Sequence, residues 1–319
     1  MEKLAVLHKE QGDILKGIGF SCLIFFLSVY IPLLGFFFSL LIPLPILFYR
    51  SKLGRHKAGV IFSVSLMIMA FAIGKLSFDL IYFSGLMLMG FLLSEHFEKG
   101  LSIEHTVLRT AGILLGAALL GLYFYSASAG KNISTVTEEY VTENLQLSLK
   151  LYKEMGMPEE TRDMIAQSVD TIRLLFLRIL PGMTVSAVLF LCWAVVLLAA
   201  RMLKIRRMPC PDFGPLTLWK VPDTLVWGVI ACGLMAMIPD SFLRTAAFNG
   251  LIVLMTVYFF GGIAIVAYYF EKKNFSPFLR VFLYSMIALW QMALLLVIGL
   301  GFFDMWVNFR KLETNGSPQ

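Results

Sequence analysis

The chain has 319 residues, of which 58% are hydrophobic and 15% are charged, whereas about a quarter of the residues in a soluble domain are charged. Its apolar residues come in runs long enough to face lipid, which excludes a soluble globular domain and makes the lipid bilayer the expected surroundings. The formal net charge of +6 arises from Lys and Arg in short patches between these runs. Such patches set membrane orientation, so we expect no nucleic-acid partner.

The first part of the chain predicts five membrane spans. The stretch from Gly17 to Tyr49 carries no charge and would be about 50 Å long as one helix, against a hydrocarbon core of about 30 Å. We therefore expect Pro32 to divide it into two spans. Residues 58–94 divide in the same way beside Gly74, and a fifth span covers residues 106–125.

The segment 127–173 is rich in acidic residues and should lie in water. Apolar residues recur at helical spacing on both sides of Gly156 and Pro158, which predicts two amphipathic helices joined at these helix-breaking residues. We expect this insert to be a helical hairpin outside the cytoplasm.

Four further spans are expected at 174–200, 222–238, 246–270 and 281–303. The predicted fold is thus an all-α, polytopic transmembrane bundle of about nine spans with an external hairpin. Its predicted parts are an N-terminal bundle (1–126), the acidic insert (127–173), a C-terminal bundle (174–303) and a polar tail (304–319).

The distribution of Lys and Arg predicts the orientation. With a cytoplasmic N-terminus, most of these residues fall in cytoplasmic connections, as the positive-inside rule requires. The outer segments then hold Lys75, Arg244, Arg310 and Lys311. An odd number of spans places the C-terminus outside, in a multi-pass protein of the bacterial inner (cytoplasmic) membrane.

Two long stretches of sequence resemble a known family. These are LWKVPDTLVWGVIACGLMAMIP and AAFNGLIVLMTVYFFGGIAIVAYYFEKK, supported by GFLLSEHFEKGLSIEHTVLRTAG earlier in the chain. They resemble the YybS-like family of uncharacterised bacterial predicted membrane proteins. The residues that carry the resemblance are Pro222, Trp227, Asn249, Gly262 and Tyr268. The pattern of N-terminal spans also resembles, to a lesser degree, the substrate-binding membrane components of energy-coupling-factor vitamin transporters.

Five polar residues in or beside the apolar runs are candidates for a cavity lining or for contacts between helices. Lys75 and Asp79 lie four residues apart and can pair on one helix face, as an ion relay or as an interfacial pair. Arg178 precedes Pro181 and could bind an anionic ligand or extend to the headgroups. Asn249 and Gln291 each need a partner in lipid, from another helix or from a polar cavity.

Small residues mark candidate faces for helix packing. Close helix approach is typical of a G-x-x-x-G pattern, which the fifth span contains. The candidate packing positions are Gly112, Gly116, Ala117 and Gly121 in the fifth span, and Gly261 and Gly262 in the eighth. The partner of the fifth span could be internal, a second copy in a homo-oligomer, or another membrane protein.

Motifs for catalysis or cofactor binding are missing from the sequence. There is no Walker A motif, dinucleotide fingerprint, zinc-protease motif or G-x-S-x-G, so we expect no enzymatic activity and no cofactor. The acidic and histidine residues in one predicted cytoplasmic connection match no metal motif and are expected to be solvated: Glu95, His96, Glu98, Glu104 and His105.

Two functions are compatible with these features. One is a transporter-like component that binds or moves a small molecule. The other is a membrane scaffold or assembly factor that acts through the external hairpin and the small-residue face.

Overall fold

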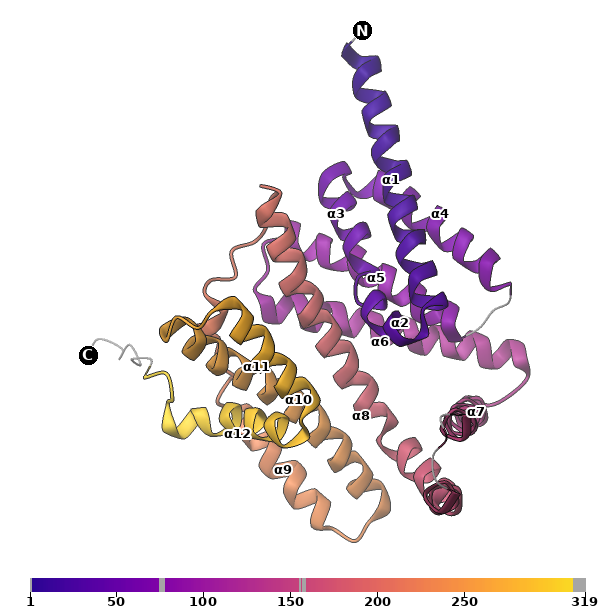
Figure 1. Cartoon of the computed structure of the whole chain (residues 1–319), viewed down its shortest axis with the longest axis vertical. Helices are drawn as coiled ribbons and strands as arrows, with labels where there is room; N and C mark the ends of the chain where they lie inside the picture. The colour runs from indigo at the N-terminus through magenta and orange to yellow at the C-terminus, as the bar shows by residue number, and fades with distance from the viewer. Residues whose placement is uncertain (1, 75–77, 155, 157–158, 312–319) are drawn as a thin grey trace. The chain divides into compact units, whose positions relative to one another are not determined.

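A computed structural model describes residues 2–74, 78–154, 156 and 159–311 of the chain, and these residues form helices without strands. The helices are α1 (Glu2–Tyr30), α2 (Pro32–Ser39), α3 (Pro43–Leu53), α4 (Arg55–Ile73), α5 (Phe78–Glu98), α6 (Ile103–Ala129), α7 (Ile133–Glu154), α8 (Glu159–Ile205), a 3-10 turn η1 (Leu216–Leu218), α9 (Leu225–Met237), α10 (Ser241–Lys272), α11 (Pro277–Leu289) and α12 (Gln291–Val307) (Figure 1). The predicted all-α membrane fold is confirmed.

The chain folds into two compact units. Unit 1 comprises Met1–Tyr140 and Ala187–Asp212, and unit 2 comprises Val141–Ser186 and Phe213–Gln319. The long helix α8 therefore begins in unit 2 and ends in unit 1. The predicted domain boundaries concern membrane topology and remain predictions.

Unit 1 is built around α3, which packs against α1, α4 and α5. Ile46, Leu47, Ile61, Met87 and Leu93 are fully buried in its core. The contact between α3 and α5 is close because a side chain at Gly90 would collide with the Pro43 carbonyl.

Unit 2 is centred on α10, which packs against α9, α12 and η1. Figure 1 shows α9 and α10 as neighbouring antiparallel helices. A side chain at Gly262 would collide with the backbone of Val297, and one at Gly301 would collide with the backbone of Tyr258. Glycine therefore allows α10 and α12 to touch through their main chains.

The predicted count of about nine spans is too high. Six of the described helices are long and apolar enough to cross a membrane: α1, α4, α5, α6, α8 and α10. The second predicted span is divided by prolines into the short helices α2 and α3. The seventh corresponds to α9, whose 13 residues extend only about 20 Å.

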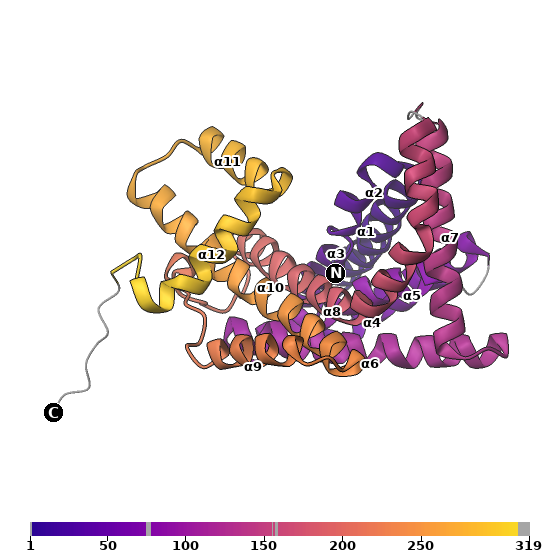
Figure 2. The same cartoon turned by 90° about the horizontal axis from the view of Figure 1, so that it is seen from below.

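The ninth predicted span is two helices. α11 and α12 meet at Trp290 with a bend of 100°, so the count rises to seven only if the bent pair is one span. Figure 2 shows the two helices meeting at this bend. Residue 290 is a tryptophan and not a proline or glycine, the residues used to predict helix breaks. The sequence pattern therefore did not predict the bend between α11 and α12.

The acidic insert is helical as expected, but its second helix continues without interruption into the sixth predicted span. α7 ends at Glu154, and Gly156 has a left-handed φ of 76°. α8 then extends over 47 residues with Pro181 in its interior. At about 1.5 Å per residue, α8 is more than twice as long as a hydrocarbon core is thick.

Candidate functional site

An open groove of about 630 Å³ lies in unit 1. Its walls are mainly apolar side chains of α1 and α3, among them Phe20, Ile24, Leu44 and Phe48. This volume falls within the range of about 300–1,000 Å³ that small-molecule sites occupy. The groove can therefore accommodate the apolar part of a small ligand.

Charged residues converge at the same groove. Its lining includes three basic side chains, Lys16, Lys52 and Arg206, and one acidic side chain, Asp13. Lys52 Nζ lies 2.7 Å from Asp13 Oδ2. Because the basic residues outnumber the acidic one, the polar part of the groove favours an anionic group.

The geometry of the groove follows from close helix packing. A side chain at Gly17 would meet Ile61 and Tyr49, so glycine at this position allows α1 to approach α3 and α4. An ion pair between Lys57 and Glu10 also joins α4 to α1. The groove was not predictable from the sequence pattern, because its charged residues come from three separate segments, each of which looks like an ordinary membrane flank.

A buried arginine organises the predicted acidic and histidine cluster. Arg50 is 1% exposed, and its Nη2 atom lies 3.2 Å from Glu98 Oε2 and 3.6 Å from Glu95 Oε2. The Arg50 guanidinium also lies 4.9 Å from the centre of the Phe91 ring. His96 instead contacts the Thr110 hydroxyl at 2.9 Å. Within the part of the chain that the structure describes, no group of three acidic, histidine or cysteine residues could hold a metal ion.

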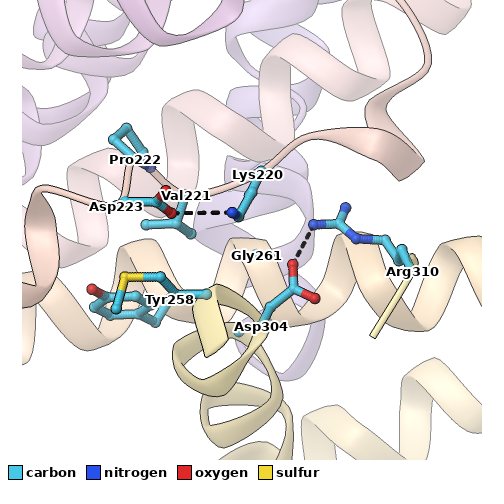
Figure 3. Close-up of a pocket in the computed structure, with 10 residues that line it drawn as sticks. Lys220, Val221, Pro222, Asp223, Tyr258, Gly261, Asp304 and Arg310 are labelled. Carbon is cyan, nitrogen blue, oxygen red and sulfur yellow. Dashed lines mark hydrogen bonds and ion pairs between the residues drawn. The ribbon is translucent and has the colours of Figure 1, made fainter. Parts of the chain in front are cut away.

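A second polar cluster lies in unit 2, at the end of α12 (Figure 3). Asp304 and Arg310 are almost fully buried and pair at 2.7 Å, and Lys220 Nζ lies 3.1 Å from Asp223 Oδ1. The cavity between these residues has a volume of about 10 Å³, which suits about one water molecule. The cluster is therefore a set of structural ion pairs, and its cavity is too small for an organic ligand.

Asn249 joins α10 to α8. Its Nδ2 atom donates to the Arg178 carbonyl at 2.8 Å, and its Oδ1 atom accepts from the Gly182 amide. In a regular helix, Gly182 N–H and Arg178 C=O would pair with each other. The Asn249 amide thus serves both backbone groups beside Pro181, and glycine at 182 is needed because a side chain there would collide with Asn249.

The other candidate residues occupy different places. Lys75 lies outside the described residues, whereas Asp79 is exposed in the first turn of α5. The side chain of Arg178 is exposed, and Gln291 is exposed at the start of α12. Asp79, Arg178, Asn249 and Gln291 are not among the described residues that line the groove or the cavity of Figure 3.

The small-residue positions also differ in their surroundings. Gly112, Gly116 and Ala117 are exposed, and an added side chain at either glycine would meet no described atom. Gly121 faces Ile81 of α5, whereas Gly261 and Gly262 face Val221 and Val297.

Comparison with known proteins places the chain in a family. A family model described as "Predicted membrane protein (DUF2232)" matches residues 19–305. The chain belongs to this family. No curated protein and no solved structure matched it. Both the family and the six long apolar helices indicate a multi-pass membrane protein.

The family match covers most of both candidate regions of the structure. It includes Phe20, Ile24 and Arg206 of the groove, as well as Lys220, Asp304 and the Asn249 contact, whereas Asp13, Lys16 and Arg310 lie outside the matched residues. The sequence pattern gave no role to Asp304 and predicted Arg310 only as a basic residue of an outer segment. One signal in the sequence could have indicated this pair: Asp304 is an acidic residue at the end of the last apolar run, and an arginine follows it closely.

Proposed function

We propose that this DUF2232 member is a transporter-like component of the bacterial cytoplasmic membrane that binds a small amphipathic anion in the groove of unit 1. Its N-terminus lies in the cytoplasm. The observation that supports this proposal is the combination of an apolar groove of about 630 Å³ with Lys16, Lys52 and Arg206 in its lining. The role is one of binding rather than catalysis.

The chemistry of the groove selects the class of ligand. A chain or ring system would lie against Phe20, Ile24 and Leu44, where its burial is favourable. A phosphate or carboxylate would lie near Lys16 and Arg206, which can form charge-assisted hydrogen bonds. The resemblance of the N-terminal span pattern to substrate-binding transporter components agrees with such a role.

The basic residues also support the orientation. The ion pairs Lys52–Asp13 and Lys57–Glu10 bring the first part of α1 next to the junction of α3 and α4. These segments therefore share one side of the membrane. The abundance of Lys and Arg there favours the cytoplasmic side.

The proposal is tested with the purified full-length protein and three probes that have the same alkyl chain: dodecyl phosphate, dodecyl maltoside and dodecyltrimethylammonium. We expect dodecyl phosphate to bind most tightly, in a saturable manner measured by native mass spectrometry. Arg206→Gln should weaken its binding about tenfold, equivalent to about 1.4 kcal/mol, and Leu44→Trp should obstruct the groove.

The control is Lys204→Gln, which removes the same charge from an exposed position of α8 outside the groove lining. It should leave binding unchanged. Equal binding of the cationic probe, or binding that is insensitive to both Arg206→Gln and Leu44→Trp, would overturn the proposal.

A scaffold role is the second candidate, and the exposed face formed by Gly112, Gly116 and Ala117 favours it. In this case α6 would pack against a second copy or another membrane protein. Gly112→Cys should then form a disulfide-linked dimer or a crosslink to a partner in native membranes. Ala118→Cys, which is exposed on the opposite side of α6 from Gly116, should do so far less. Equal crosslinking at both positions would remove the support for this role.

A further inference from the structure

Three separate parts of unit 2 meet where α12 ends. Arg310 Nη1 donates to the carbonyl oxygens of Thr217, at 2.9 Å, and Trp219, at 2.8 Å. The Tyr269 hydroxyl donates to the Phe309 carbonyl at 2.7 Å. Direct hydrogen bonds cannot extend across a hydrocarbon core of about 30 Å. The segment before α9, the end of α10 and the end of α12 therefore lie at the same side of the membrane.

The start of α11 lies at that side as well. Arg280, in the first turn of α11, donates from Nε to the Phe275 carbonyl at 2.9 Å and from Nη2 to the Phe270 carbonyl at 3.2 Å. Phe270 belongs to the last turn of α10. These bonds hold the beginning of α11 against the end of α10.

We propose that α11 and α12 form a re-entrant hairpin, which enters the membrane and returns to the side from which it came. The pair begins and ends at one side, and the two helices bend by 100° at Trp290. Their 13 and 17 residues extend about 20 and 26 Å. Each helix is therefore shorter than the hydrocarbon core.

The charges identify the side. The meeting point of these segments is surrounded by basic residues: Lys220, Lys272, Lys273, Arg280 and Arg310. The connection between α9 and α10 holds Asp240 at the opposite end of the α9–α10 hairpin, followed by Arg244. By the positive-inside rule the meeting point is cytoplasmic. The chain thus leaves α12 in the cytoplasm, in contrast to the external C-terminus that nine spans predict.

The test is cysteine labelling of the full-length protein in sealed membrane vesicles of known orientation, in a background without the four native cysteines. Three exposed positions are compared: Lys220→Cys, Pro239→Cys and Lys311→Cys. We expect a membrane-impermeant maleimide to label positions 220 and 311 from the same side and position 239 from the other.

A second measurement does not require cysteines. A fluorescent reporter that matures only in the cytoplasm and a phosphatase that is active only outside are each fused after Gln319. Fluorescence without phosphatase activity is the expected result. Phosphatase activity, or labelling of position 311 from the side that labels position 239, would overturn the re-entrant hairpin.

Discussion

Polar side chains inside the apolar helices have specific hydrogen-bonding tasks. Each polar group of the Asn249 side chain is used: Nδ2 donates to the Arg178 and Thr245 carbonyls, and Oδ1 accepts from Gly182. The need of Asn249 for a partner was predictable because an amide in lipid is costly without one. The identity of the partner was not predictable, since it depends on how α8 and α10 pack.

Replacing Asn249 should separate α10 from α8. We expect Asn249→Ala to lower the free energy of unfolding by about 1–2 kcal/mol, because two backbone groups lose a partner where water is scarce. Reversible unfolding in mixed micelles measures the change. The matched control is Thr256→Ala, whose hydroxyl bonds to the Ile252 carbonyl of its own helix. An equal loss in the two variants would contradict the role of Asn249 between helices.

At the scale of helices, proline and glycine were reliable guides to where helices end. α1 ends before Pro32, and α4 ends at Gly74, which has a left-handed φ of 74°. The bend at Trp290 and the continuity of the second insert helix with the sixth predicted span were missed. The bend depends on tertiary contacts, because the start and end of the α11–α12 pair are tied to α10. The sixth span was expected to continue through Pro181, as α8 does, but the hydrogen bonds of Asn249 to the backbone there were not foreseeable.

The contact between α10 and α12 depends on the absence of a side chain at Gly301. Gly301→Ala should destabilise the protein by about 1–3 kcal/mol, because its Cβ would collide with the Tyr258 carbonyl. At Gly299, in the same helix, an added Cβ would contact no other residue. Gly299→Ala should therefore be neutral or stabilising by up to about 1 kcal/mol. Thermal unfolding in detergent compares the two. Similar melting temperatures would show that the helices do not depend on main-chain contact.

At the scale of the whole molecule, composition and charge were enough to predict a multi-pass helical membrane protein. They were not enough to give the number of spans, because hydropathy cannot distinguish a crossing from a short or bent helix. The α11–α12 pair is as apolar as a true span. Its bend and the contacts between its two ends, which arise only in the folded chain, distinguish it. The groove was missed for a related reason: Asp13, Lys52 and Arg206 are brought together only by folding.

The orientation of the N-terminal half can be checked with inserted reporters. A phosphatase inserted after Gly130, in the turn between α6 and α7, should be active because this turn is expected outside the cytoplasm. The same insertion after Gly100, in the turn between α5 and α6, should be inactive. Both glycines are exposed and have left-handed φ angles, so the two insertions disturb similar turns. The reverse pattern would invert the proposed topology.

The contact of Asn249 with α8 has a consequence for biosynthesis. Ribosomes synthesise proteins from the N-terminus, so α8 reaches the translocon before α10 has been made. During this interval the Gly182 amide and Arg178 carbonyl lack the amide group that serves them in the folded protein. The middle of α8 therefore acquires its final set of hydrogen bonds only when α10 enters the membrane, and assembly of these two helices is coupled to the order of translation.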